Sequence, residues 1–287
     1  MIAFLVHLRL QFQLILSGIF LWAFLLAGGV PDGRAGLAFL VLHLLLYGGT
    51  TAYNAYYDQD KGPVTGLRAP PPAGRLCLWG GLGFMAAGAL LAPCAGLPFT
   101  LVYVAIALLS IAYSHPRIRL KNGPASSLLV VAFGQGLLGF LAGAVVAVPA
   151  GWPRFDFALV CGGLAATLLV TGLYPLTQVF QIEADLARGD RSFAAHFGPR
   201  AVFHTTLGCF GFALVAALPA ARTVFTGPET LFLVVALVAL CSVVWFWSQR
   251  YDPSRVIANH DRVLTLGLVT SGSFVALIVR HLAARVH

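Results

Sequence analysis

Two short polar clusters interrupt an otherwise apolar sequence, and in each an amide is followed four residues later by a carboxylate. Residues four apart share one face of a helix, one turn from each other. Amide and carboxylate oxygens are ligands that Mg²⁺ accepts, together with water and the phosphate oxygens of a substrate. Neither cluster contains His or Cys, which disfavours zinc. The predicted metal ligands are Asn54, Asp58, Asp60, Gln181, Glu183 and Asp185.

Each cluster is also consistent with a simple polar helix end in water. Against this, an apolar run leads directly into Asp58, and a carboxylate beside a membrane is costly unless it is paired or binds a cation. In the second cluster the spacing of Gln178, Gln181 and Asp185 predicts one polar stripe on a helix. The two clusters lie four predicted helices apart, a spacing typical of an internal duplication. Together they favour a binding site over solvated helix ends.

A basic segment adds the opposite charge; it reads Tyr113-Ser114-His115-Pro116-Arg117-Ile118-Arg119-Leu120-Lys121-Asn122. Arginine binds phosphate oxygens in a bidentate manner and lysine acts as a point charge, so this segment predicts an anion-binding site. Its other interpretation is a topology signal on the inner side of a membrane. Arg68 adds a further cation from the Pro- and Gly-rich loop 62–74. This loop cannot form a regular helix, and we expect it to cover the site as a stiff lid.

The elements that must position these residues are membrane-spanning helices. Of the 287 residues, 59% are hydrophobic and 10% charged, and the mean hydropathy is +0.86. Soluble domains carry about 25% charged residues, so a soluble, disordered or coiled-coil protein is excluded. Apolar stretches of about 20 residues, the length that spans a bilayer, recur along the chain. We predict an all-α polytopic membrane protein, with one transmembrane domain over residues 1–287 and nine helices at 10–29, 36–57, 76–94, 98–114, 125–148, 157–183, 199–220, 229–249 and 262–285.

The distribution of charge orients this predicted bundle. With the amino terminus inside, 13 of the 18 Lys and Arg residues fall on the inner side. The positive-inside rule therefore predicts a cytoplasmic amino terminus and an outer carboxyl terminus in a cell membrane. Seven of the ten acidic residues fall on the same side, where topology does not require them. The net charge of +8 then indicates an anionic membrane surface or a phosphorylated substrate as partner, and no nucleic acid.

With these features the sequence resembles the UbiA superfamily of intramembrane prenyltransferases. Asn54 and Asp58 match the first and fifth positions of the family's Asn-Asp-x-x-Asp-x-x-x-Asp pattern after its second helix. The run from Tyr113 to Arg117 is similar to the family's Tyr-containing basic segment after helix four. Residues 181–185, followed by Gly-Asp-Arg-Ser at 189–192, are similar to its second Asp-rich motif. The nine-helix layout agrees, so the resemblance covers essentially the whole chain.

The sequence departs from the family pattern at three positions. Ala55 and Gly62 stand where the first motif usually has acids, and Gln181 stands where the second usually opens with Asp. The lost charge predicts weaker metal binding, or a change in which metal positions are filled. The departures therefore mark a divergent branch of the family.

The resemblance implies Mg²⁺-dependent transfer of a prenyl group from an isoprenoid diphosphate to a lipophilic or aromatic acceptor in the membrane. Mg²⁺ held by the first cluster, either alone or together with a second ion at the second cluster, would clamp the diphosphate while the basic residues neutralise the leaving group. The predicted catalytic residues are Asp58, Asp185, Arg117 and Lys121. The predicted substrate-binding residues are Tyr57, Arg68, Tyr113, Arg117, Arg119 and Lys121. The aromatic residues expected to wall the cavity and favour a carbocation are Tyr53, Tyr56, Tyr57, Phe133 and Phe180.

Two alternatives remain at this point. A terpene cyclase on the same scaffold would let the allylic cation react with an alkene of its own chain instead of an acceptor. A transporter or lipid-binding protein would place ionisable groups near the middle of the membrane. Most carboxylates in this sequence fall at predicted helix ends, which favours a catalytic pocket that opens at the surface.

Overall fold

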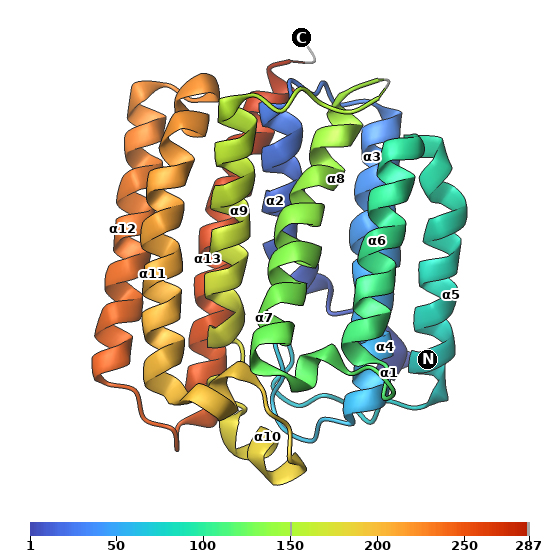
Figure 1. Ribbon diagram of the computed structural model, residues 1–287, viewed down its shortest axis with the longest axis vertical. Helices are drawn as coiled ribbons and strands as arrows, with labels where there is room; N and C mark the ends of the chain where they lie inside the picture. The colour runs from blue at the N-terminus through green and yellow to red at the C-terminus, as the bar shows by residue number, and fades with distance from the viewer. Residues whose placement is uncertain (150, 286–287) are drawn as a thin grey trace.

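The computed structural model describes residues 1–149 and 151–285, which form a bundle of long helices running side by side (Figure 1). The helices are α1 (Ile2–His7), α2 (Leu10–Leu26), α3 (Gly33–Leu40), the π-helix η1 (Val41–Tyr47), α4 (Gly48–Asp58), α5 (Arg75–Leu91), η2 (Ala92–Ala95), α6 (Leu97–Ser114), η3 (Leu120–Asn122), α7 (Pro124–Val131), the π-helix η4 (Ala132–Leu137), α8 (Leu138–Ala147), α9 (Phe157–Leu176), α10 (Ile182–Arg188), α11 (Phe193–Val224), α12 (Gly227–Gln249) and α13 (Val256–Ala283).

Nine helical stretches in the described part of the chain are long and apolar enough to cross a membrane, as predicted. They are Ile2–Leu26, Gly33–Asp58, Arg75–Ala95, Leu97–Ser114, Pro124–Ala147, Phe157–Leu176, Phe193–Val224, Gly227–Gln249 and Val256–Ala283. The predicted all-α polytopic fold is confirmed. The amino terminus lies at the same end of the bundle as α10, and the last helix, α13, ends at the opposite end (Figure 1).

The predicted helix 157–183 is wrong at its carboxyl end, because α9 ends at Leu176. A series of turns follows, in which the Gln178 N–H donates to the Pro175 carbonyl at 3.0 Å and the Gln181 N–H donates to the Gln178 carbonyl at 2.9 Å. The short helix α10 begins only at Ile182. Gln178 and Gln181 therefore do not share a continuous helical stripe with Asp185. The turns contain buried apolar residues, so hydropathy alone does not show the break.

The first predicted helix, 10–29, begins at Leu10 as α2 does, but the prediction omitted the helical turns before it. A short helix, α1, precedes α2, and Arg9 separates them with a left-handed backbone (φ 48°). A left-handed conformation costs a non-glycine residue about 1–2 kcal/mol. This break turns the chain so that the Arg9 side chain is buried, with only 8% of its surface exposed.

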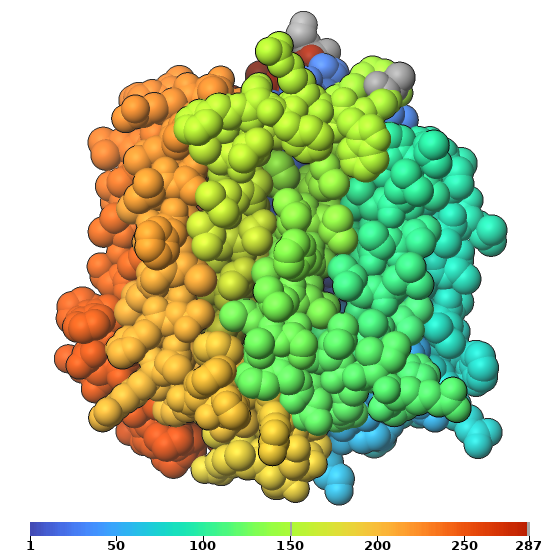
Figure 2. All heavy atoms as spheres, viewed as in Figure 1, coloured from blue at the N-terminus to red at the C-terminus, as the bar shows by residue number. Residues whose placement is uncertain are grey.

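Close helix crossings hold the middle of the bundle together. Helix α2 packs against α8 and α13, and α9 packs most extensively against α11. Small residues permit such crossings in membrane proteins because they let two backbones approach. At the crossing of α2 and α8, a Cβ added to Gly143 would overlap the carbonyl oxygen of Phe20. Figure 2 shows that side chains fill most of the space between helices on the face drawn.

Substituting Gly143 by Ala is therefore expected to destabilise the protein. The added methyl group meets backbone, which cannot rotate away, so the free energy of unfolding should fall by about 1–3 kcal/mol. Thermal unfolding of the detergent-purified protein measures the effect. Gly208→Ala on α11 is the matched control, since no neighbouring atom lies within 4 Å of the added Cβ. Because Ala favours helix over Gly, this control should unfold at or above the wild-type temperature; equal losses in both variants would contradict the packing argument.

Candidate active site

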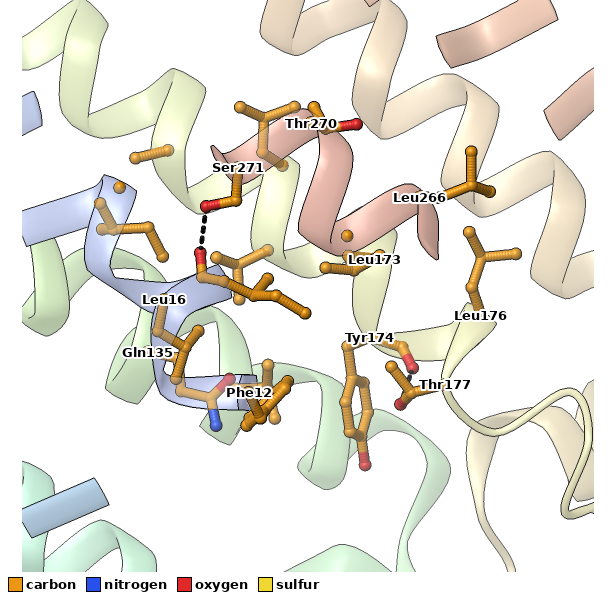
Figure 3. Close-up of a pocket in the computed structure, with 18 of the residues that line it drawn as sticks. Phe12, Leu16, Gln135, Leu173, Tyr174, Leu176, Thr177, Leu266, Thr270 and Ser271 are labelled. Atoms are coloured by element: carbon orange, nitrogen blue, oxygen red, sulfur yellow. Dashed lines mark hydrogen bonds between the residues drawn. The ribbon is translucent and has the colours of Figure 1, made fainter. Parts of the chain in front are cut away.

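A cavity of about 730 Å³ lies inside the bundle. Its apolar lining comes mainly from α2, α9, α11, α12 and α13, and its polar lining gathers near the ends of α4 and α9. Figure 3 shows part of this lining, with labelled residues on α2, η4, α9 and α13. The labelled residues there are Phe12, Leu16, Gln135, Leu173, Tyr174, Leu176, Thr177, Leu266, Thr270 and Ser271. The cavity therefore combines a polar end with a long apolar body.

The two polar clusters meet at the polar end. The Gln181 side-chain amide donates to the Pro63 carbonyl at 2.9 Å, and the Arg188 guanidinium lies 3.1 Å from Asp60. These contacts join segments more than 100 residues apart in the sequence. The polar residues that line the cavity here are Arg9, Asn54, Asp58, Asp60, Tyr113, Ser114, Gln135, Tyr174, Gln178 and Gln181.

At the carboxyl end of α4, the side chains of Asn54 and Asp58 both bind the ammonium group of Lys121. The Asn54 amide donates to one Asp58 carboxylate oxygen at 2.8 Å, as the one-turn spacing predicts. The Lys121 ammonium contacts the other Asp58 oxygen and donates to the Asn54 carbonyl oxygen at 3.1 Å. The Ser114 hydroxyl donates to the same Asn54 oxygen at 2.7 Å. The residues predicted as metal ligands thus already attract positive charge.

Lys121 is poorly hydrated in this position, with 11% of its side chain exposed. Burial lowers the pKa of its ammonium group to about 7, while the charges of Asp190 and Asp185 oppose this shift. Lysine is a point charge on a flexible stem. It can therefore exchange a carboxylate partner for a phosphate without rearranging the helices.

Arg188 is the centre of the second cluster. Its guanidinium lies 2.6 Å from Asp185, 3.0 Å from Asp190 and 3.1 Å from Asp60. Arg119 adds a second cation, 2.9 Å from Asp190. Burial raises the pKa values of Asp60 and Asp185, and Arg188 opposes both shifts. Burial also acts to raise the pKa of Asp190, but the bonds from Arg188 and Arg119 outweigh it, and that pKa is lowered.

Seven predicted site residues lie outside the cavity lining, and four of these have surroundings elsewhere in the protein. Glu183 is exposed on α10, and Arg117 is exposed in the segment after α6. Arg68, with 68% of its side chain exposed, pairs with Asp261 at 2.8 Å. Tyr57 packs its ring against the rings of other aromatic residues at 5.1–6.0 Å between centroids. The other three are Lys121, which contacts Asp58 of the lining, and Arg119 and Asp185, whose side chains bind Asp190 and Arg188 outside the lining. The predicted residues that line the cavity are Asn54, Asp58, Asp60, Tyr113 and Gln181.

The expected aromatic wall is corrected by the structure. Phe133 is 53% exposed, Phe180 packs against His260, and the three tyrosines at 53, 56 and 57 do not line the cavity. The helices are apolar on most sides, so sequence spacing does not show which side faces inward. The aromatic residues that line the cavity are Phe12, Trp22, Tyr47, Tyr113, Tyr174, Phe210, Phe232 and Phe274.

Sequence reasoning missed two residues at the polar end. The sequence analysis counted Arg9 only among the inner-side Lys and Arg residues that orient the bundle. In the structure Arg9 lines the cavity, and its Nε has no hydrogen-bond partner among the described residues. Tyr174 was not singled out, although its hydroxyl is hydrogen-bonded to that of Tyr113 at 2.9 Å. The available signal for Arg9 was a lone cation between two apolar stretches. A buried cation without such a partner is costly and indicates a role in binding anions.

The loop between α4 and α5, which the sequence predicts to be a lid, contributes to the lining at this end of the cavity. Val64 and Thr65 line the cavity. His260 donates from Nε2 to the Val64 carbonyl at 3.0 Å, and His7 donates from Nε2 to the Pro71 carbonyl at 2.7 Å. The loop is therefore tied to α1 and α13 as well as to Gln181.

The donor atoms of the first cluster fit Mg²⁺. Asn54, Asp58 and Asp60 supply hard oxygen atoms that face the cavity, and a cation is already bound to two of these residues. They make a partial ligand set, which substrate oxygens and water would complete. Within the described residues, no three His, Cys, Asp or Glu side chains are grouped so that they could hold a metal ion by themselves.

The second cluster does not fit a metal ion in the same way. Both oxygens of the Asp185 carboxylate are bound, one by Arg188 and the other by the Ser192 hydroxyl at 2.5 Å. Gln181 donates its amide to the loop, and Glu183 is exposed away from the cavity. Metal binding here would require these contacts to break.

Comparisons with known proteins agree with this architecture. The model of the UbiA prenyltransferase family matches residues 16–269. A UbiA homologue from Archaeoglobus fulgidus bound to GPP and Mg²⁺ is 18% identical, with 96% of this chain and 99% of that chain covered and a TM-score of 0.68. The apo UbiA homologue from Aeropyrum pernix K1 is also 18% identical, with coverage of 92% and 97% and a TM-score of 0.64. No curated protein sequence matches the chain.

A digeranylgeranylglyceryl phosphate synthase structure has the same fold. It is 14% identical, with 94% of this chain and 97% of that chain covered and a TM-score of 0.60. At these identities the likeness to solved structures shows the fold alone.

Proposed function

The chain belongs to the UbiA prenyltransferase family, and from this premise we propose that this multi-pass membrane protein transfers a prenyl group from an isoprenoid diphosphate to a lipophilic acceptor. The observation that carries the proposal is the cavity, whose polar end holds the cations and carboxylates and whose body is apolar. Such a cavity matches a substrate with a diphosphate head and a hydrocarbon tail. The Archaeoglobus fulgidus homologue was solved with GPP or DMAPP together with Mg²⁺, which supports the same substrate class here.

The cations of the polar end would bind the diphosphate head. Arg9 lines the cavity, and its Nε has no hydrogen-bond partner among the described residues, so this atom can donate to a phosphate oxygen without breaking a bond within the protein. Lys121 can turn from Asp58 to the diphosphate. Mg²⁺, when held by Asn54, Asp58 and Asp60, supplies Lewis-acid stabilisation of the leaving group. Positive charge fixed in a poorly hydrated site stabilises the negative charge that develops as the allylic C–O bond breaks.

The apolar body of the cavity would hold the prenyl tail and exclude water. Excluding water matters because an allylic cation is otherwise captured by it. Tyr113 and Tyr174 line the cavity beside the polar residues, and their ring faces favour a nearby cation. The acceptor would then approach the cation within the same apolar space.

The function is tested by isoprenoid diphosphate turnover in detergent-purified protein with membrane lipid as the acceptor. Release of diphosphate from GPP or DMAPP is expected with Mg²⁺ and should be lost with a chelator, because the leaving group then lacks its metal ion. The products should be prenylated lipids. Cyclic hydrocarbon or alcohol formed without an acceptor would instead support a cyclase, and no turnover of any allylic diphosphate would refute both enzymes.

A further inference from the structure

The contacts of Arg188 point to a cation built into the protein at the second cluster. We infer that Arg188 takes the place of a second divalent metal ion, so that this chain binds its diphosphate substrate with one Mg²⁺. The inference rests on the proposed function for the identity of the substrate. It concerns the number of metal ions, which the family assignment does not decide for a chain with altered acidic motifs.

Arg188 contacts a different carboxylate with each of its three nitrogens. Nε lies 3.0 Å from Asp190, one terminal nitrogen 3.1 Å from Asp60 and the other 2.6 Å from Asp185. A guanidinium is planar, permanently charged and carries five N–H donors, so it can satisfy several carboxylates at once. Three carboxylates near one point need positive charge between them, because like charges at this distance repel strongly in a poorly hydrated site.

The protein leaves little room in this cluster for a metal ion. Five of the six carboxylate oxygens of Asp60, Asp185 and Asp190 contact Arg188, Arg119 or Ser192. The three carboxylates carry three negative charges and the two arginines carry two positive ones. A net charge of about −1 remains, which is too small to attract a divalent ion strongly.

The local backbone holds Arg188 in place. Helix α10 ends at Gly189, whose left-handed backbone (φ 73°) turns the chain back on itself. The Asp190 N–H then donates to the Asp185 carbonyl at 2.9 Å. Ser192 caps the start of α11 and also donates to the Asp185 carboxylate. Asp185, Arg188 and Asp190 are therefore arranged before any ligand binds.

Among the described residues, Asn54 and Asp58 of the first cluster bind no such fixed cation, whereas one carboxylate oxygen of Asp60 contacts Arg188. Lys121 contacts one oxygen of Asp58 and one of Asn54, and it is a single charge on a flexible stem. It can leave these oxygens for the diphosphate and free them for Mg²⁺. Arg188, which is bound on three sides, cannot do so at a similar cost. The two clusters therefore differ in whether their cation is exchangeable.

The test counts metal ions bound to the full-length protein in detergent. Mn²⁺ serves as the probe for Mg²⁺, and a slowly reacting thiolo-diphosphate analogue of GPP occupies the substrate site. Bound Mn²⁺ is measured by equilibrium dialysis. Wild type is expected to bind one Mn²⁺ per chain, and Arg188→Met is expected to bind two, because the three carboxylates then keep only Arg119. Arg255→Met, which removes an exposed Arg–Asp pair elsewhere, should bind one like wild type.

Two Mn²⁺ ions or none in wild type, or only one in a folded Arg188→Met variant, would overturn the inference. If Arg188→Met does not fold, the wild-type count alone decides. Turnover of GPP in the same preparation separates the two proposals. One bound Mn²⁺ without turnover would refute the proposed function but support the inference of a single metal ion. Turnover with two bound Mn²⁺ ions would refute the inference of a single metal ion but support the proposed function.

Discussion

Replacing Asp58 by Asn is expected to lower isoprenoid diphosphate turnover by about 1,000-fold or more. Asn keeps the shape of the side chain but removes the charge that holds both Lys121 and the proposed Mg²⁺. The variant therefore loses the metal ligand and leaves a buried ammonium group unpaired. Turnover is measured with saturating Mg²⁺, and Mn²⁺ binding is measured on the same preparation. Loss of both would separate a metal role from a purely structural one.

Asp156→Asn is the matched control for this substitution. Asp156 caps the start of α9, and its carboxylate accepts from the Leu159 N–H at 2.9 Å. The start of α9 lies at the end of the bundle opposite to α10 (Figure 1). Asn is an equally good helix cap, so this variant should keep the wild-type turnover. An Asp58→Asn variant as active as this control would show that Asp58 does not bind the metal ion.

Replacing Arg9 by Met is expected to lower kcat/KM for the isoprenoid diphosphate by about 100-fold. Met has a similar length, but it removes a cation at the polar end of the cavity. The same change should leave the protein as stable as wild type or more stable, because it removes a buried charge whose Nε has no partner among the described residues. Steady-state kinetics and thermal unfolding check the two effects separately.

Arg9→Lys and Arg222→Met complete this experiment. Lys restores the charge without the planar donor set, so it should recover part of the lost activity. Arg222 is exposed near the end of α11, away from the cavity lining, and its replacement by Met should leave kcat/KM unchanged. An Arg9→Met variant that is unstable but retains its kcat/KM would show that Arg9 serves the fold and not the substrate.

Much of the fold follows from local properties of the sequence. A run of about 20 apolar residues spans a membrane whatever its neighbours are, so the nine spanning segments and the helical fold class could be predicted. Asn54 and Asp58 also form their predicted pair, because a four-residue spacing brings two side chains together on any helix. The predicted polar stripe of Gln178, Gln181 and Asp185 did not form, because the helix that it required ends at Leu176.

The rest of the site depends on which helix faces pack together. Phe133 points outward and Phe12 lines the cavity, although both lie in apolar helical segments that hydropathy does not distinguish. Arg9 faces the cavity because the chain turns between α1 and α2, and Arg188 meets Asp60 because the ends of two distant helices lie together. In a bundle whose helices are apolar on most sides, burial in lipid and burial in protein select the same residue types. The sequence therefore determined the membrane-spanning helices and the residue types of the site, and the tertiary structure decided which cation each carboxylate binds.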